Sequence, residues 1–171
     1  MPSTPPNVAN YFIGRGNVYT AAVDSTSWAH IGNCPKFSVA PSMDILQHFS
    51  STAAGGRVLD DSQLNTKSCR LTINADELHA ESVMLALGAT SIGGGIYRMQ
   101  SDIVYRAVKL EGTNSKGPKV QIILPKVMFR TEGDIDFIGQ EYLSLPLTGD
   151  VLFYPKTAGG TDYTFLDLVF L

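Results

Sequence analysis

The sequence predicts a mainly β protein with one amphipathic helix. Of its 171 residues, 44% are hydrophobic and only 17% are charged, and 16 glycines supply turns between short segments. The segment Lys67–Asn74 alternates as a half-buried strand does, with Cys69, Leu71 and Ile73 on one face and polar side chains on the other. The one segment with clear helical spacing of apolar residues is Ala75–Leu87. A single amphipathic helix in such a chain is expected to pack on one open sheet.

Length and charge narrow the class of protein. A chain of 171 residues suits one domain with extended arms. The formal net charge of -3 argues against a protein that binds nucleic acid by neutralising phosphates, although it suits a conduit along which DNA slides without sticking. The first ten residues, MPSTPPNVAN, are proline-rich and polar, so we expect an arm here and no signal peptide. No apolar run is long enough to span a membrane, so we expect a protein made and kept in a cytoplasm.

Short strands and turns are expected in the first part of the chain. The small residues of Gly14–Gly16 let the backbone turn and restart as a strand. The expected strands are Tyr11–Ile13, Asn17–Ala22, Trp28–Ile31 and Lys36–Pro41, with a turn at Asp24–Ser27.

The segment Met43–Asn65 is unusual because its few apolar residues keep neither the helical nor the strand period. Long structureless loops inside a compact domain are uncommon and are usually functional. The strands on either side would make a hairpin with a very long tip. We therefore expect a functional loop at about residues 44–63.

The helix and the strands that follow it have clear boundary signals. Asn74 is the expected N-cap of the helix, and Gly88 is expected to end it. A turn at Thr113–Pro118 should join two strands as a hairpin, and Pro125 should end the second strand or lie at an edge or bulge. The expected strands are Ile96–Met99, Ile103–Glu111, Lys119–Leu124, Val127–Arg130, Asp134–Ile138, Tyr142–Thr148 and Val151–Tyr154.

The chain end is very apolar. Lys156–Thr161 is expected to be a flexible joint, and Phe165–Leu171 follows it with the sequence FLDLVFL. Such an apolar segment would favour aggregation if it stayed exposed and unpaired. We expect it to add to a sheet, either its own or that of a neighbour.

The sequence shows no cluster that predicts catalysis, a cofactor or a metal. His30, His48 and His79 each lack a second ligand at strand or helix spacing. Cys34 and Cys69 form no CxxC pair, and we expect both to be free thiols. Serine-hydrolase elbow, dinucleotide and Walker A motifs are absent. A catalytic triad is recognised by geometry and not by sequence order, so a small hydrolase stays an alternative, but the expectation is a protein that is not an enzyme.

One acidic segment resembles the start of a calcium loop. It consists of Asp134, Ile135 and Asp136, but Phe137 and Ile138 stand where oxygen ligands should continue. We therefore expect no calcium site.

Three segments, in this order and spacing, resemble the tail tube proteins of long-tailed (siphophage-type) bacteriophages. Tyr11–Tyr19 (YFIGRGNVY) is similar to the glycine-centred opening strand of that family. Ile31–Phe37 (IGNCPKF), with the later Gly55-Gly56-Arg57 and Asp60-Asp61, is similar to a strand and a long loop. Cys69–Gly88 is similar to a strand and helix closed by glycine. Val120–Tyr154, with its LPLTGDVL run, resembles the last strands, whereas the chain after Gly149 departs from the family.

The resemblance implies a β-sandwich or barrel-like fold, flanked by one helix, over residues 11–154. Residues 1–10 would be an N-terminal arm, and residues 155–171 a joint and an apolar strand. Hexameric rings would stack into the tail tube of the virion, assembled in the cytoplasm of a host bacterium. The channel would guide the tape-measure protein and double-stranded DNA, and the tube ends would meet the tail terminator and distal tail proteins.

The resemblance also implies two sets of interface residues. The long loop would reach the neighbouring ring, and the residues there are Asp44, Gln47, His48, Phe49, Ser50, Gly55, Gly56, Arg57, Asp60 and Asp61. The contacts within a ring and by the arms would involve Tyr11, Phe12, Phe165, Leu168 and Phe170.

Two other classes stay open. The inner tube protein of a contractile tail, or of a type VI secretion system, would share the ring architecture. A monomeric β-barrel that carries a small ligand, or a small hydrolase, would not assemble.

Overall fold

The computed structural model describes residues 11, 14–50, 57–99, 103–113, 116–130, 132–138, 142–155 and 163–171. These residues form the mainly β fold with one helix that the sequence predicts, and the helix is α1 (Ala80–Leu87). The strands are β1 (Gly16–Ala21), β2 (Ala29–His30), β3 (Lys36–Ser50), β4 (Val58–Ala75), β5 (Ala89–Ser91), β6 (Tyr97–Met99), β7 (Val104–Gly112), β8 (Val120–Arg130), β9 (Leu145–Val151), β10 (Tyr154–Pro155), β11 (Tyr163–Thr164) and β12 (Asp167–Phe170).

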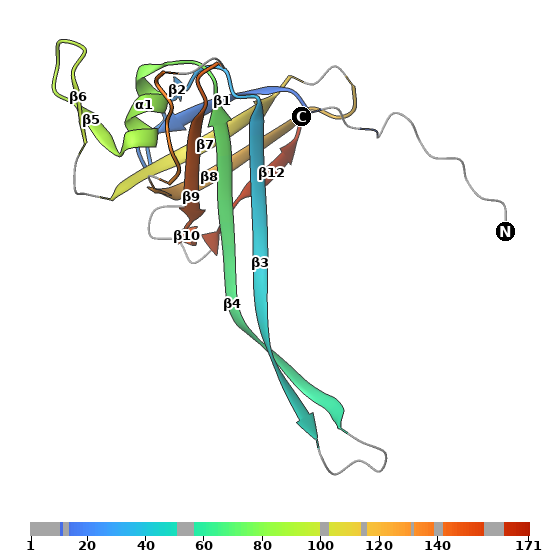
Figure 1. The fold of residues 1–171 in the computed structure, drawn as a ribbon. Helices are drawn as coiled ribbons and strands as arrows, with labels where there is room; N and C mark the ends of the chain where they lie inside the picture. Colours follow the sequence, from blue (N-terminus) through green and yellow to red (C-terminus); the bar gives the residue numbers. More distant parts are fainter. Residues whose placement is uncertain are drawn as a thin grey trace.

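One antiparallel sheet organises the described residues. Its order is β2-β1-β7-β8-β9-β4-β3, and β12 also pairs with β8. Strand β8 pairs with two strands along one edge: Val120–Ile123 pairs with β12, and Val127–Arg130 pairs with β9. Figure 1 shows β7 and β8 crossing the direction of β3 and β4, so the sheet is strongly curled.

The core lies on the concave side of this sheet, where α1 also packs against β9. Strict alternation brings Cys69, Leu71 and Ile73 of β4 inward, as the sequence predicts, and Leu71 and Ile73 are fully buried. Strand β9 follows the same pattern with Leu145 and Leu147. A buried Leu or Ile side chain contributes about 1.5–3 kcal/mol by burial, so both strands contribute substantially to the stability of the domain.

Gly149 allows β8 and β9 to approach closely. A Cβ at this position would lie 2.5 Å from Val127 Cγ1 and 3.1 Å from the Met128 carbonyl oxygen. Val127 is itself fully buried, so it has little room to move away. We expect Gly149→Ala to lower the free energy of unfolding by about 1–3 kcal/mol, measured by urea denaturation. Ser144→Ala, at an exposed position before the same strand, serves as the control and should change it by less than about 0.5 kcal/mol.

The helix is shorter than the sequence predicts. Strand β4 continues to Ala75, which pairs with Leu145, so residues 75–79 do not begin the helix and Asn74 is not its N-cap. His79 is the N-cap: its Nδ1 accepts a hydrogen bond from the Glu81 amide, and its own amide donates to Ser82 Oγ. His79 is therefore half-buried at the helix terminus and does not lie on a solvated helix face. Gly88 ends the helix in the left-handed conformation (φ 56°), as expected.

Several strand predictions are confirmed, and two are wrong. Val151–Tyr154 is not a strand, because β9 ends at Val151 and residues 152–153 lie in no strand. Strands β7 and β8 form the expected hairpin, and Pro125 lies beside a register shift between Arg106 and Val108, in a β8 that continues through it. Residues 134–138 have no strand structure, because they lie in the connection that leads to β9 and pair with no strand of the described residues. The apolar chain end forms β12 and joins this chain's own sheet. The expected joint at residues 156–161 lies outside the described residues, as do Phe12 and Ile13 of the first expected strand.

The expected long loop is mostly a β-ribbon. Strands β3 and β4 stay paired from Lys36 opposite Asn74 to Ser50 opposite Val58, with two register shifts. Figure 1 shows this hairpin projecting far from the rest of the molecule. At about 3.3 Å per residue, residues 43–50 alone reach about 25 Å. We call residues 43–50 and 57–67 the arm. Residues 51–56, between its two strands, lie outside the described residues.

Candidate functional site

The arm has one apolar face. Phe37 and Val39 of β3 pack against the core, and strand alternation places Met43, Ile45 and Phe49 on the same side of β3 farther along. The cross-strand partners continue the pattern, since Ile45 lies opposite Leu64 and Phe49 lies opposite Leu59. The inward face of the sheet therefore continues beyond the body as an apolar strip, which we define as Met43, Ile45, Phe49, Leu59 and Leu64.

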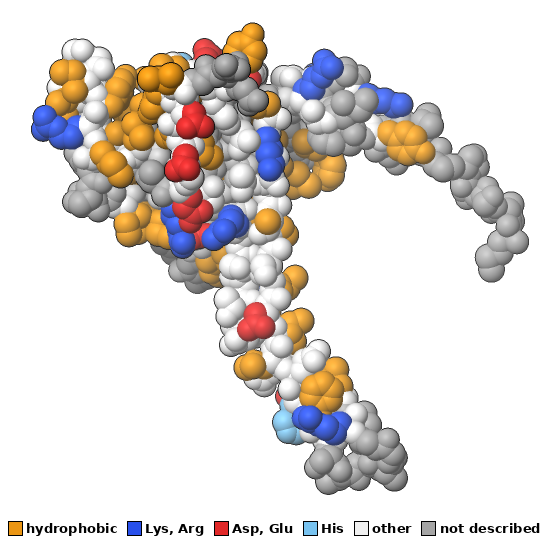
Figure 2. Space-filling view, in the orientation of Figure 1, with side chains coloured by type: hydrophobic (Ala, Val, Ile, Leu, Met, Phe, Trp, Pro, Cys, Tyr) orange, Lys and Arg blue, Asp and Glu red, His pale blue; other side chains and the backbone are white. Residues whose placement is uncertain are grey.

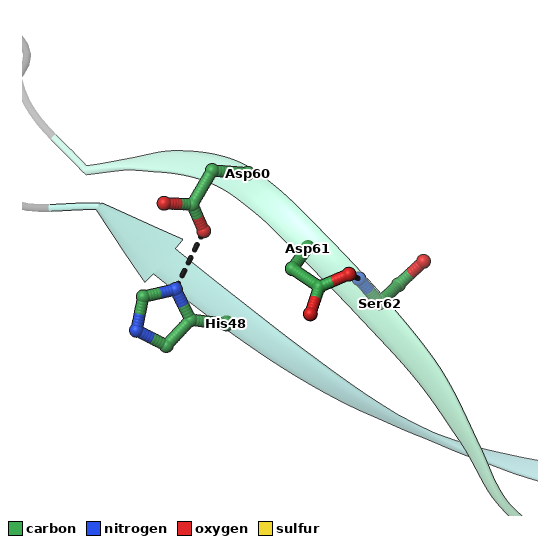
Figure 3. A network of polar contacts seen from close by, with 4 residues as sticks. All are labelled: His48, Asp60, Asp61 and Ser62. Atoms are coloured by element: carbon green, nitrogen blue, oxygen red, sulfur yellow. Dashed lines mark hydrogen bonds and ion pairs between the residues drawn. The ribbon is translucent and has the colours of Figure 1, made fainter.

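The opposite face of the arm carries polar groups that satisfy one another. His48 Nδ1 lies 2.6 Å from Asp60 Oδ1, and the Asp61 carboxylate accepts the Ser62 amide at 2.8 Å (Figure 3). Asn65 Nδ2 donates to Asp44 Oδ2 at 2.7 Å. These contacts fix the ribbon locally. Because they are exposed, each contributes little to stability.

The apolar strip is exposed. Met43 is 63% exposed, Ile45 52% and Leu64 57%. Figure 2 shows hydrophobic side chains along the projecting ribbon, with no second layer of described residues over them on the face shown. Single exposed apolar residues are normal, but several on one face of a projecting element are typical of a contact surface, although Gln47 opposite Ser62 interrupts this strip.

The structure brings together most of the residues that the sequence analysis assigned to the inter-ring loop. Asp44, Gln47, His48, Phe49 and Ser50 lie on β3. Asp60 and Asp61 lie on β4, and the guanidinium carbon of Arg57 lies 5.2 Å from the centre of the Phe49 ring. Gly55 and Gly56 lie outside the described residues.

The residues that the resemblance assigned to contacts within a ring and by the chain termini lie in two separate places. Leu168 and Phe170 lie on β12 and are exposed, while Phe165 packs against Phe153 with ring centres 5.0 Å apart. Tyr11 is half-exposed, with Lys116 Nζ 5.5 Å from its ring centre, and Phe12 lies outside the described residues.

The sequence analysis missed the apolar strip apart from Phe49. The signal is the alternation that starts at Phe37 and Val39 and continues through Met43, Ile45 and Phe49. Two features hide it. Leu46 adds an apolar residue on the opposite face, and the register shifts interrupt the pattern on β4.

A second apolar surface lies on the body, where the curled sheet leaves a groove of about 730 Å³. Its walls come from β1, β3, β7, β8 and β12, strands from both ends of the sheet. The side chains lining it include Val18, Cys34, Phe37, Val39, Leu110, Val120, Ile122, Leu168 and Phe170. Its charged lining residues are Arg15 and Lys36, both basic.

Both cysteines are free thiols, as expected. Burial in the groove wall, with a smaller effect from the Asp76 and Glu77 carboxylates, raises the pKa of Cys34 to about 11. Burial also raises the pKa of Cys69. Since the thiolate is the nucleophile, neither cysteine is activated for chemistry at neutral pH.

Charged side chains on the convex face of the sheet pair with one another. Asp150 on β9 pairs with Arg130 on β8 and lies 3.6 Å from Arg70 on β4. Lys109 lies over the rings of Tyr19 and Trp28 and pairs with Glu111 at 2.7 Å. The pairs that Asp150 makes join β9 to β8 and to β4, whereas Lys109 and Glu111 both lie on β7.

Within the described ranges, no three His, Cys, Asp or Glu side chains are grouped closely enough to hold a metal ion. No helix among these same residues is long and apolar enough to cross a membrane.

Comparison with known protein families matches part of the chain. The model of a family described as "protein of unknown function UCP028589" matches residues 11–93, a stretch that contains β1, the whole arm and α1. No curated protein matches the chain. The chain is thus similar to that family over the part that builds the projecting ribbon.

Proposed function

We propose that this protein is the major tail tube subunit of a long-tailed bacteriophage, a structural protein without enzymatic activity. Its copies would form hexameric rings that stack around a channel for the tape-measure protein and DNA. The observation that carries the proposal is the arm with its exposed apolar strip. The tape-measure, terminator and distal tail partners, and the place in the virion, rest on the resemblance of the sequence to tail tube proteins.

The arm favours assembly for energetic reasons. A two-stranded ribbon is at best marginally stable alone in water, and the side chains of the apolar strip stay 38–63% exposed. Transfer of a side chain such as Ile45 or Leu64 into a contact contributes about 1.5–3 kcal/mol. A surface of this kind is explained if another molecule covers it, and copies of the same chain are always present at the same place and concentration.

The free edges of the sheet support the same proposal. Strand β3 is the last strand of the sheet order, so within the described residues its outer edge has no strand partner. Exposed long edges favour uncontrolled pairing between chains, and closure into a larger barrel removes them. A ring whose subunits pair edge to edge would use this feature. The net charge of -3 is compatible with a channel that does not retain DNA.

Electron microscopy of the purified protein tests the proposal. We expect negative-stain images to show rings or tubes of uniform diameter, with the tube fraction rising with protein concentration. A ligand-carrying β-barrel or a small hydrolase would remain an 18.5 kDa monomer. A monomer that forms neither rings nor tubes at high concentration in several buffers would rule the proposal out. A sheath protein encoded beside this chain would instead place it in a contractile tail or a type VI system.

A further inference from the structure

The arm and the groove are separate surfaces whose chemistry matches. We infer that the groove between β1, β3, β8 and β12 receives the arm of a second copy of this chain. The inference rests on the proposed function, self-assembly, and adds the place where the arm docks.

The first argument is the shape and polarity of the two surfaces. The groove holds about 730 Å³, which accommodates several large side chains, and its wall is mainly apolar. Leu168 and Phe170 stand exposed in that wall, as Met43, Ile45 and Leu64 do on the arm. Docking would cover both exposed apolar surfaces at once, and burial of apolar area is the main favourable term in association.

The second argument is that the arm cannot reach the groove of its own chain. Phe37 and Val39 line the groove at the base of β3, and the same strand then continues, paired with β4 throughout, to Ser50. Figure 1 shows the arm leading away from the body. The occupant must therefore come from another molecule. An arm that enters a different surface on the next copy makes a head-to-tail contact, and such contacts generate rings or open filaments.

The third argument is charge. The groove presents Arg15 and Lys36, and neither makes an ion pair within the described part of the chain. The arm carries Asp44, Asp60 and Asp61 against the two cations Arg57 and Lys67. These carboxylates lie on the face opposite the strip, so a ribbon lying strip-down in the groove turns them toward the rim. Complementary charge of this kind sets orientation and register more than affinity.

Cysteine cross-linking tests the docking. In a Cys34→Ser, Cys69→Ala background, Leu168→Cys is combined either with Ile45→Cys, on the apolar strip, or with Leu46→Cys, on the opposite face. The assembled protein is treated with a short bismaleimide and analysed on a denaturing gel. We expect a ladder of covalent oligomers from the Ile45→Cys protein and at least about five times less product from the Leu46→Cys protein. The Leu168→Cys protein alone should give no ladder.

Each outcome of the cross-linking experiment either supports or overturns the inference. Equal ladders from positions 45 and 46, or tubes that form normally while neither position cross-links to position 168, would overturn the groove as the receiving site and leave the proposed function standing. Failure of the unsubstituted protein to form rings or tubes would overturn both. As a second measurement, charge reversal by Arg15→Glu with Lys36→Glu should lower tube formation at least about tenfold, and Asp60→Lys with Asp61→Lys should restore part of it. Loss without any restoration would count against charge pairing between the arm and the groove.

Discussion

We expect replacement of residues 43–67 with a short Gly-Asn-Gly-Ser connection to abolish tubes while leaving the body folded. Ser42 lies opposite Ser68, so the connection joins two positions that are already neighbours across the ribbon. Residues 43–49, 57 and 59–67 are exposed, and the buried part of β4 begins only at Cys69. The core therefore keeps its contacts, whereas assembly loses the whole apolar strip. We expect circular dichroism and thermal unfolding close to those of the intact protein, and sedimentation as a monomer.

A matched pair of substitutions separates the apolar strip from the arm as a whole. Ile45→Ser with Leu64→Ser removes one cross-strand pair from the strip. Losing two buried side chains at about 1.5–3 kcal/mol each should raise the concentration needed for tubes by about a hundredfold or more. Leu46→Ser, on the opposite face, should change it little. Normal tubes from the armless protein, or equal effects of the two substitutions, would contradict a role for the strip in assembly.

The class of fold could be predicted from the sequence because period-two alternation is strong where one face is buried. Strand β4 shows it best at Cys69, Leu71 and Ile73. The helix boundary could not be predicted, because Asn74 and Asp76 satisfy the rules for a helix start. The pairing of Ala75 with Leu145 overrides those local signals. Tertiary pairing of this kind leaves no trace in the local sequence.

The site was predicted in part. The sequence indicated that the stretch around residues 44–63 is unusual, whereas its functional role and the role implied by the resemblance to tail tube proteins stay predictions. The sequence did not show that this stretch is a paired ribbon. Both strands of the ribbon are exposed, so neither needs the alternating pattern of a strand that packs on a core. The groove could not be predicted either. Its walls come from strands at opposite ends of the sheet, so it exists only once the sheet has curled.

The second large effect is expected from removal of strand β12. Removing Phe165–Leu171 takes Phe165 and Leu166 away from the core and strips the Val120–Ile123 edge of β8. Losing a packed Phe side chain alone costs about 3–5 kcal/mol, so we expect a much less stable and less soluble protein that forms no rings. Denaturant unfolding and size-exclusion chromatography measure the two effects.

The single substitution Phe170→Ser separates fold from interface in this strand. Phe170 is 67% exposed and lines the groove, so its loss should change the free energy of unfolding by less than about 0.5 kcal/mol. Its contribution appears only when a second copy covers it, and then it is worth about 1.5–3 kcal/mol, or a tenfold or greater rise in the concentration at which tubes form. An unchanged ring population after Phe170→Ser would place β12 outside every interface and confine the apolar chain end to a role in its own sheet.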